Sequence, residues 1–170
     1  MRFLLVMMLL VWSLPAQADV YLEPQAFVKQ QFVGNPPQAK VIWLNKTLKS
    51  KLTEILQHEY AGLRVRYWQG GQDGQKTVWV LNEIGKEKNI TVGITIEQGK
   101  IRQLQVLAFR ESRGWEVKHD FFTRQFLSLF LKEDMSLSGH IDSITGATLS
   151  VRAVKKLAKV ALYLHQTVQP

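Results

Sequence analysis

Segments of alternating hydrophobicity, joined by glycine-containing turns, constrain the fold of this chain most strongly. Residues 63–68 (LRVRYW) and 76–82 (KTVWVLN) alternate on either side of GGQDGQ at 70–75, and residues 89–109 alternate on either side of a turn at 98–99. Alternation around a short turn is typical of a β-hairpin. Two consecutive hairpins predict a four-stranded antiparallel meander with one buried face.

Helical periodicity appears before and after this meander. An apolar stripe predicts a helix over residues 46–60, which Asn45 caps and Gly62 ends. Similar stripes predict helices over residues 120–132 and about 149–165. This order of elements predicts one α+β domain, in which an antiparallel or mixed β-sheet packs against helices.

The chain divides into a predicted signal peptide at residues 1–18, an N-terminal helical entry segment at 19–62 and a main domain at 63–170. The first part of the entry segment, residues 19–45, contains prolines and has weak periodicity, so we expect irregular structure with one short helix there. Within the main domain, Gly93 interrupts a predicted strand, which indicates either a bulge or the close approach of another group.

The N-terminal segment has the composition of a secretory signal peptide. Arg2 precedes an apolar run, and Ala16 and Ala18 occupy the −3 and −1 positions of a signal-peptidase site before Asp19. The run has about a dozen residues, short of the roughly 20 that a membrane-spanning helix needs. We therefore predict export and cleavage before Asp19, with an uncleaved membrane anchor as the alternative.

Composition narrows the class of protein further. The chain has no cysteine, which excludes disulfides, thiol catalysis, thiolate metal sites and a lipid-anchored precursor. Its 22 basic and 14 acidic residues give a net charge of +8, a balance that suits anionic ligands or membrane surfaces. Export and the lack of a nucleic-acid-binding motif argue against nucleic acid as a partner. We expect a periplasmic bacterial protein.

Most of the chain carries no recognisable catalytic or metal-binding motif. GGQDGQ lacks the Lys-Ser/Thr pair of a phosphate-binding loop. The histidines have no metal-ligand spacing, so we predict no metal site and expect them at the surface or at helix ends; they are His58, His119, His140 and His165. The tryptophans of the exported chain are expected in the core, apart from Trp115, which lies in a predicted loop.

The heptapeptide DSITGAT directly precedes the last predicted helix. Gly146 and Ala147 remove side-chain bulk where the backbone enters the helix, and its unpaired N–H groups and positive dipole favour an anion there. Thr148 adds a hydroxyl, and Arg152 adds a cation one turn later on the same side. The alternative is a simple helix cap, supplied by Thr145 or Thr148.

Residues Asp142 to Thr148 resemble the Asp-x-x-Ser/Thr-Gly-Ala-Thr signature of the covalent FMN-binding domain family. That family includes the flavin-carrying subunits of the sodium-translocating NADH:quinone reductase and of Rnf complexes, and small periplasmic relatives. In it, a periplasmic flavin transferase takes FMN from FAD and joins its phosphate to the last threonine. The resemblance implies a phosphoester at Thr148 and makes Asp142 the acid of the recognition motif. It leaves Thr145 as the helix cap.

A second segment, Phe109 to Gly114, resembles the loop that precedes the signature in small relatives of the family. The respiratory-complex subunits carry Glu-Thr-Pro-Gly there, of which this chain keeps only Glu111 and Gly114. The whole resemblance covers about residues 63–162. With it, the predicted cofactor-binding residues beside Thr148 are Asp142, Thr145, Gly146, Ala147, Arg152, Glu111, Ser112, Arg113, Gly114 and Trp115.

The loop residues have specific predicted roles. Trp115 is the candidate for stacking on the flavin ring, and Glu111, Ser112 and Gly114 are expected to shape its edge. The charge of Arg113 would favour a reduced, anionic flavin. The alternatives are that Trp115 belongs to the core, and that Glu111 and Arg113 only pair with each other across a turn.

The resemblance implies an electron carrier with covalent FMN rather than a stand-alone enzyme. Such a protein would relay electrons between a membrane-bound reductase and an acceptor, and its partners would be the flavin transferase and that membrane-bound protein. One alternative is a non-redox exported module that binds a phosphorylated ligand at the same helix N-terminus. Another is a reductase with its own acceptor.

Overall fold

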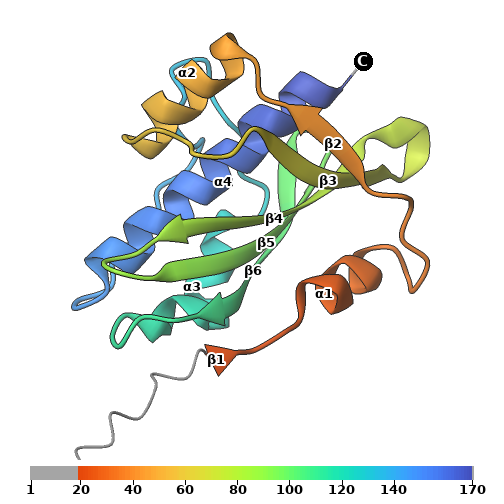
Figure 1. The fold of residues 1–170 in the computed structure, drawn as a ribbon. Helices are drawn as coiled ribbons and strands as arrows, with labels where there is room; N and C mark the ends of the chain where they lie inside the picture. Colours follow the sequence, from red (N-terminus) through yellow and green to blue (C-terminus); the bar gives the residue numbers. More distant parts are fainter. Residues whose placement is uncertain (1–18, 170) are drawn as a thin grey trace, which may run out of the picture.

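A computed structural model describes residues 19–169, and the predicted signal peptide lies outside the described residues. The strands form one antiparallel sheet in the order β1-β6-β5-β4-β3-β2 (Figure 1). The sheet packs against helices, so the predicted α+β fold is confirmed. The strands are β1 (Asp19–Val20), β2 (Lys40–Trp43), β3 (Arg64–Gly70), β4 (Lys76–Ile84), β5 (Asn89–Glu97) and β6 (Lys100–Phe109).

The predicted hairpins form the centre of the sheet. Strands β3 and β4 pair from Tyr67–Trp79 to Gly70–Lys76, and β5 and β6 turn at Gln98 and Gly99, both with positive φ. Positive φ at both turn positions matches the right-handed twist of the flanking strands. The predicted four-stranded meander is therefore confirmed.

The edge strands come from the entry segment and were not predicted. Strand β1 pairs with the end of β6, and β2 pairs with β3. Both are short, and their side chains are mostly exposed, so neither shows an apolar alternation. Trp43 of β2 is 65% exposed, so the expectation that it belongs to the core is wrong.

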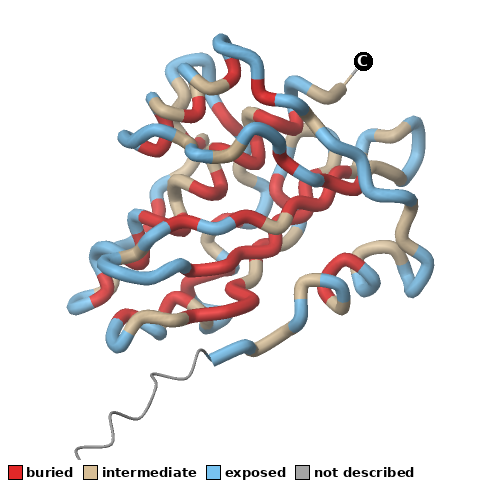
Figure 2. The backbone as a smooth tube through the Cα atoms, in the orientation of Figure 1, coloured by how far each residue is buried: buried red, intermediate tan, exposed pale blue. Residues whose placement is uncertain are grey.

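Helices α2 (Lys46–Leu56) and α4 (Thr148–Val168) cover one face of the sheet. Apolar side chains of α4 pack on β4, β5 and β6, and α2 packs beside α4. Figure 2 shows the buried residues concentrated in these central strands and helices, with exposed residues in the outer loops. Among residues 19–169, no helix combines the length and the apolar character needed to cross a membrane.

Helix α1 (Pro24–Gln31) covers the opposite face, so the prediction of one buried face is wrong. A second apolar cluster forms there, consisting of Phe27, Val28, Trp68, Val78 and Leu107. A Cβ atom at Gly93 would lie 2.6 Å from ring atoms of Phe27. The glycine thus reflects the close approach of α1, while the register shifts of β5 lie elsewhere, at 91/92 and 95/96.

The helix predicted over residues 46–60 begins as expected, but its predicted end is wrong. Asn45 does cap α2, with its Oδ1 accepting a hydrogen bond of 2.9 Å from the N–H of Leu48. The helix, however, ends at Leu56 because Gln57 adopts a left-handed conformation (φ 60°), well before Gly62.

The helix predicted over residues 120–132 is also wrong. Only α3 (Asp120–Thr123) and a 3₁₀ turn, η3 (Arg124–Phe126), form there. Ser128 then has a φ of 64°, and its N–H donates to the carbonyl of Ile101 at 2.8 Å. Pairing with the start of β6 therefore replaces the last helical turns.

Candidate functional site

Helix α4 begins at Thr148, and its N-terminus carries no side-chain cap. Ala147 occupies the N-cap position, so the prediction that Thr145 caps the helix is wrong. Thr145 instead lies in a turn that the N–H of Ala147 closes by donating to the carbonyl of Ile144 at 3.0 Å, with Gly146 in a left-handed conformation (φ 83°). The turn places Thr145 before the N-cap position.

The first turn of α4 therefore has free donors. Val151 is the first residue whose N–H bonds within the turn, to the carbonyl of Ala147 at 2.9 Å. The N–H groups of Thr148, Leu149 and Ser150 precede that bond and have no helical acceptor. No acidic residue lies in this turn, so the positive end of the helix dipole is uncompensated there.

Thr148 is exposed and lies between two hollows. The first, which we call the loop hollow, has a volume of about 570 Å³ and is lined by Lys86, Glu111, Ser112, Arg113 and residues 146–150. The second, which we call the basic groove, has a volume of about 320 Å³ and runs along α4 towards the end of α2. Thr148 lines both hollows, so this exposed residue lies at the boundary between them.

Gly114 of the predicted loop packs against the end of the signature and the first turn of α4. It is buried, has a φ of 87°, and leaves no room for a Cβ atom against Ser150 of α4. The same Cβ would lie 3.5 Å from Cα of Ala147. Two sequence segments more than 30 residues apart thus meet at the start of α4.

Glu111 anchors a neighbouring turn. Its Oε1 accepts hydrogen bonds from the N–H groups of Lys86, Glu87 and Lys88, the last two at 2.7 and 2.8 Å. Burial raises the pKa of this carboxyl, but the three N–H donors and the charge of Lys86 outweigh it, so the pKa lies below its usual value. Among the described residues, the side chain does not pair with Arg113.

Trp115 lines neither the loop hollow nor the basic groove. It begins a 3₁₀ turn, η2 (Trp115–Lys118), and is 46% exposed, so the alternative that it belongs to the core is wrong. Its ring meets the edge of His119 at a centroid distance of 5.3 Å, and Nζ of Lys118 lies 5.2 Å from its centroid. Trp115 thus has an exposed ring next to Gly114.

Asp142 also lies outside both hollows. Its backbone N–H donates to Oε1 of Gln125 at 2.7 Å, and its exposed carboxylate lies 3.6 Å from Nε2 of His140. It remains available at the surface, at the start of the signature. Its neighbour Ser143, which was not predicted, lines the basic groove.

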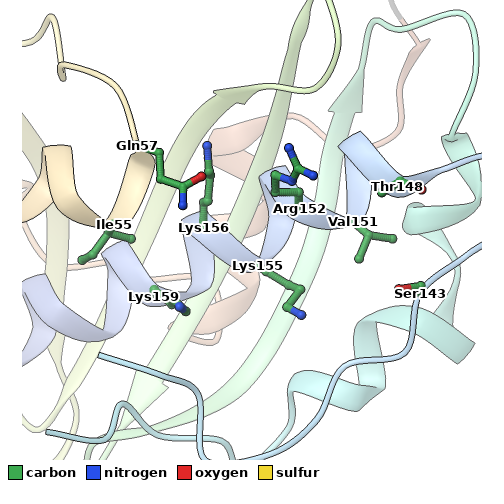
Figure 3. A pocket seen from close by; sticks show the side chains of 9 residues that line it. All are labelled: Ile55, Gln57, Ser143, Thr148, Val151, Arg152, Lys155, Lys156 and Lys159. Carbon is green, nitrogen blue, oxygen red and sulfur yellow. The ribbon is translucent and has the colours of Figure 1, made fainter. Parts of the chain in front are cut away.

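The predicted residues therefore divide into three groups. Those at the loop hollow are Glu111, Ser112, Arg113, Gly146, Ala147 and Thr148, with Gly114 directly behind it. Arg152 lies in the basic groove, one turn beyond Thr148 (Figure 3). Those outside both linings are Asp142, Thr145 and Trp115.

Sequence reasoning missed several residues at these hollows. Lys86 reaches the loop hollow from the β4–β5 turn, and no local sequence signal marks it. Lys155, Lys156 and Lys159 line the basic groove, and their helical spacing on the polar face of α4 was a usable signal. Within residues 19–169, no group of three or more His, Asp or Glu side chains could hold a metal ion.

One comparison with known proteins bears on this site. The family model of the FMN-binding domain matches residues 85–163. The matched segment contains the turn at residue 86, the loop at 111–115, the signature and most of α4. No curated protein matches the chain.

Proposed function

Because the family model of the FMN-binding domain matches residues 85–163, we propose that this protein carries FMN joined through its phosphate to Oγ1 of Thr148. The proposed role is that of a periplasmic electron carrier, not of a stand-alone enzyme. Bound FMN supplies one- and two-electron redox chemistry, while the protein sets its position and its electrostatic surroundings.

The observation that carries the proposal is the uncapped N-terminus of α4 with an exposed hydroxyl at its first residue. An ester phosphate on Thr148 would lie at the free N–H groups of the first turn, where the helix dipole favours negative charge. A capping side chain or a first-turn acid would compete with such a phosphate, and α4 has neither. The residues present therefore fit an ester phosphate.

The loop hollow is the proposed position of the flavin ring. Ser112, Arg113 and Lys86 line this hollow and offer hydrogen-bond donors to the ring. The positive charges of Arg113 and Lys86 would favour an anionic, reduced ring. Trp115 directly follows Gly114 and is half-exposed, but it does not line this hollow, so this position of the ring gives no support to its predicted stacking role.

The proposed partners follow from the same site. A flavin transferase would recognise the signature, for which the exposed Asp142 is available. Electron exchange would involve a membrane-bound reductase and a separate acceptor, and the net positive charge of the chain suits docking to acidic partners. The predicted signal peptide supports a periplasmic location.

Intact mass spectrometry tests the proposal. Coexpression with an active flavin transferase should increase the mass of the chain by one FMN less one water. Thr148→Ala should abolish this increase, while Thr47→Ala, at an exposed threonine outside the signature and both hollows, should retain it. An unchanged mass in the presence of an active transferase would contradict the proposal and favour a non-redox module that binds a phosphorylated ligand.

A further inference from the structure

The sheet face that carries α1 is exposed at its outer edge. Helix α1 packs mainly on β4 and β5, whereas β2 forms one edge of the sheet (Figure 1). Val41 of β2 pairs with Arg66 of β3, and Trp43 pairs with Arg64, so each pair points to one face. Both arginines share the face of Trp68, which belongs to the cluster under α1, because alternate residues of a strand point the same way. The two paired rows therefore form one surface beside α1.

The apolar side chains of this surface are exposed to solvent. Trp43 is 65% exposed, and Val41 is 40% exposed. Leu63, directly before β3, is 66% exposed, and its carbonyl accepts a hydrogen bond of 3.0 Å from the N–H of Leu44, beside the end of β2. Exposed apolar side chains that gather in one place mark a contact surface. We call this surface the edge patch and define it by Val41, Trp43, Leu63, Arg64 and Arg66.

The charge of the edge patch is positive and uncompensated. Among the described residues, neither Arg64 nor Arg66 has a carboxylate within ion-pair distance. The guanidinium of Arg64 instead lies 5.5 Å from the ring centroid of Trp43. The segments that contain β2 and β3, residues 40–53 and 60–72, hold six lysines and arginines and no acidic residue. An anionic partner would thus meet no opposing charge from these two segments.

A hollow beside the edge patch is lined by both arginines. It has a volume of about 340 Å³, and no lining residue is acidic. Its other lining residues come from the start of α1 and from β2, β3 and β4, and they are Pro24, Gln25, Val41, Trp68 and Val80. Guanidinium groups bind phosphate oxygens through parallel N–H groups. The hollow therefore offers a place for a phosphate group next to exposed apolar side chains.

We propose that the edge patch binds the surface of a membrane that contains anionic phospholipids. Lipid phosphates would lie at Arg64 and Arg66, where each basic side chain adds to the attraction of an anionic surface. The ring of Trp43 would enter the boundary between headgroups and acyl chains, the region in which tryptophan is enriched in membrane proteins. A purely acidic polypeptide would pair with the arginines and leave the apolar side chains in water, whereas a lipid surface accommodates both.

The edge patch is separate from the flavin site. Its hollow shares no lining residue with the loop hollow or the basic groove. Helix α4 packs on the opposite face of the sheet, so the patch and Thr148 belong to different faces. The inference therefore does not depend on the proposed function, and binding through the patch would leave Thr148 accessible.

Sedimentation with lipid vesicles tests the proposal. The exported chain, which begins at Asp19, should bind vesicles made of equal amounts of phosphatidylcholine and phosphatidylglycerol. It should not bind vesicles of phosphatidylcholine alone, and added salt should weaken its binding to the mixed vesicles, because salt screens exposed charges. No binding to the mixed vesicles, or equal binding to both kinds, would overturn the proposal.

Variants without the arginine charges locate the binding surface. Arg64→Gln with Arg66→Gln should weaken binding to the mixed vesicles about tenfold, since two charges next to the anionic surface are lost. Lys100→Gln with Lys132→Gln removes the same charge from exposed positions outside the patch and should leave binding nearly unchanged. Equal weakening by both pairs would show that net charge alone causes binding and would overturn the assignment to the patch.

The apolar contact has its own control. Trp43→Ser should weaken binding about fivefold, because the exposed ring no longer enters the interface. Phe121→Ser removes a ring of similar exposure, 60%, outside the patch and should have little effect. Soluble polyglutamate separates a lipid surface from an acidic polypeptide. Polyglutamate binding as tight as vesicle binding, with Trp43→Ser changing neither, would overturn the lipid assignment and favour an acidic polypeptide.

Discussion

Gly114 lies directly against Ser150, with no room between them for a Cβ atom. This contact fixes the loop at 111–115 to the first turn of α4. Gly114→Ala should lower the free energy of unfolding by roughly 2–4 kcal/mol, because it adds a steric clash to an unfavourable positive φ. Urea unfolding measures the loss.

Gly146 provides the control for the Gly114 prediction. It has a similar φ of 83°, but a Cβ there would meet no atom within 4 Å. Gly146→Ala should therefore cost only the backbone strain, roughly 1–2 kcal/mol. Adding Ser150→Gly to Gly114→Ala should recover part of the stability, and a double variant no more stable than Gly114→Ala would show that packing against Ser150 is unimportant.

Glu111 should stabilise the protein through the turn at residues 86–88. Its folded-state pKa is lowered, so its contribution is present above the unfolded value near 4.5 and disappears as the pH falls through the folded value. Glu111→Gln should cost about 1 kcal/mol at pH 7, because a neutral acceptor replaces a charged one. Chemical denaturation at pH 7 and pH 3 measures the difference, which should be smaller at the lower pH. Glu87→Gln, on the same turn but exposed, should have little effect at either pH.

Gly93 tests the packing of α1 on the second face of the sheet. Gly93→Ala should destabilise the protein by about 1–3 kcal/mol, because the added methyl group meets the ring of Phe27. Combining it with Phe27→Leu should cost less than the sum of the single changes, since both act at one contact. Additive costs in urea unfolding would contradict this contact.

His165 should make the stability of the protein sensitive to acid. Its Nε2 accepts a hydrogen bond from the N–H of Gly99 at 3.3 Å, so Nδ1 carries the hydrogen and lies 2.7 Å from Oγ1 of Thr77. Trp79 Nε1 also donates to that oxygen, at 2.8 Å. Burial lowers the pKa of His165 to about 4, which favours this neutral ring.

The sign of the pH effect follows from that pKa. Between pH 6.5 and about 4 the unfolded chain binds a proton that the folded protein does not, so stability is full above this window and falls with pH inside it. The total loss is about 3 kcal/mol. Denaturation at several pH values should show this slope in the wild type and in His140→Asn, an exposed histidine, but a shallower slope in His165→Asn. Equal slopes in all three would exclude His165 as the cause.

The central sheet and the long helices could be predicted from sequence because their signals are local. Glycine turns and alternation define β3 to β6, and an apolar stripe defines α4. The edge strands have two and four residues with exposed side chains, so no pattern marks them. The stretch after Phe126 keeps helical spacing, but its hydrogen bonds with Ile101 draw it into pairing with β6.

The sequence identified many of the residues at the site, but not the contacts that these residues make with one another. The signature located Thr148 at the start of a helix, within one residue of its observed first position. Other features of the site depend on contacts between segments that are distant in the sequence. Glu111 accepts hydrogen bonds from the turn at 86–88, and Lys86 of that turn lines the loop hollow. The position of Thr145 outside the helix was not marked by the local sequence either. Local patterns carry no information about such contacts.

The two ends of α4 lie in different surroundings. The stability of the fold in acid and the electrostatic surroundings of Thr148 are therefore controlled separately. Thr148 faces solvent at one end, and His165 is buried near the other. Their separation along the axis is roughly 25 Å, about three times the Debye length of roughly 8 Å at physiological ionic strength. A proton gained at His165 therefore changes the fraction of protein that is folded and leaves the electric potential at Thr148 almost constant.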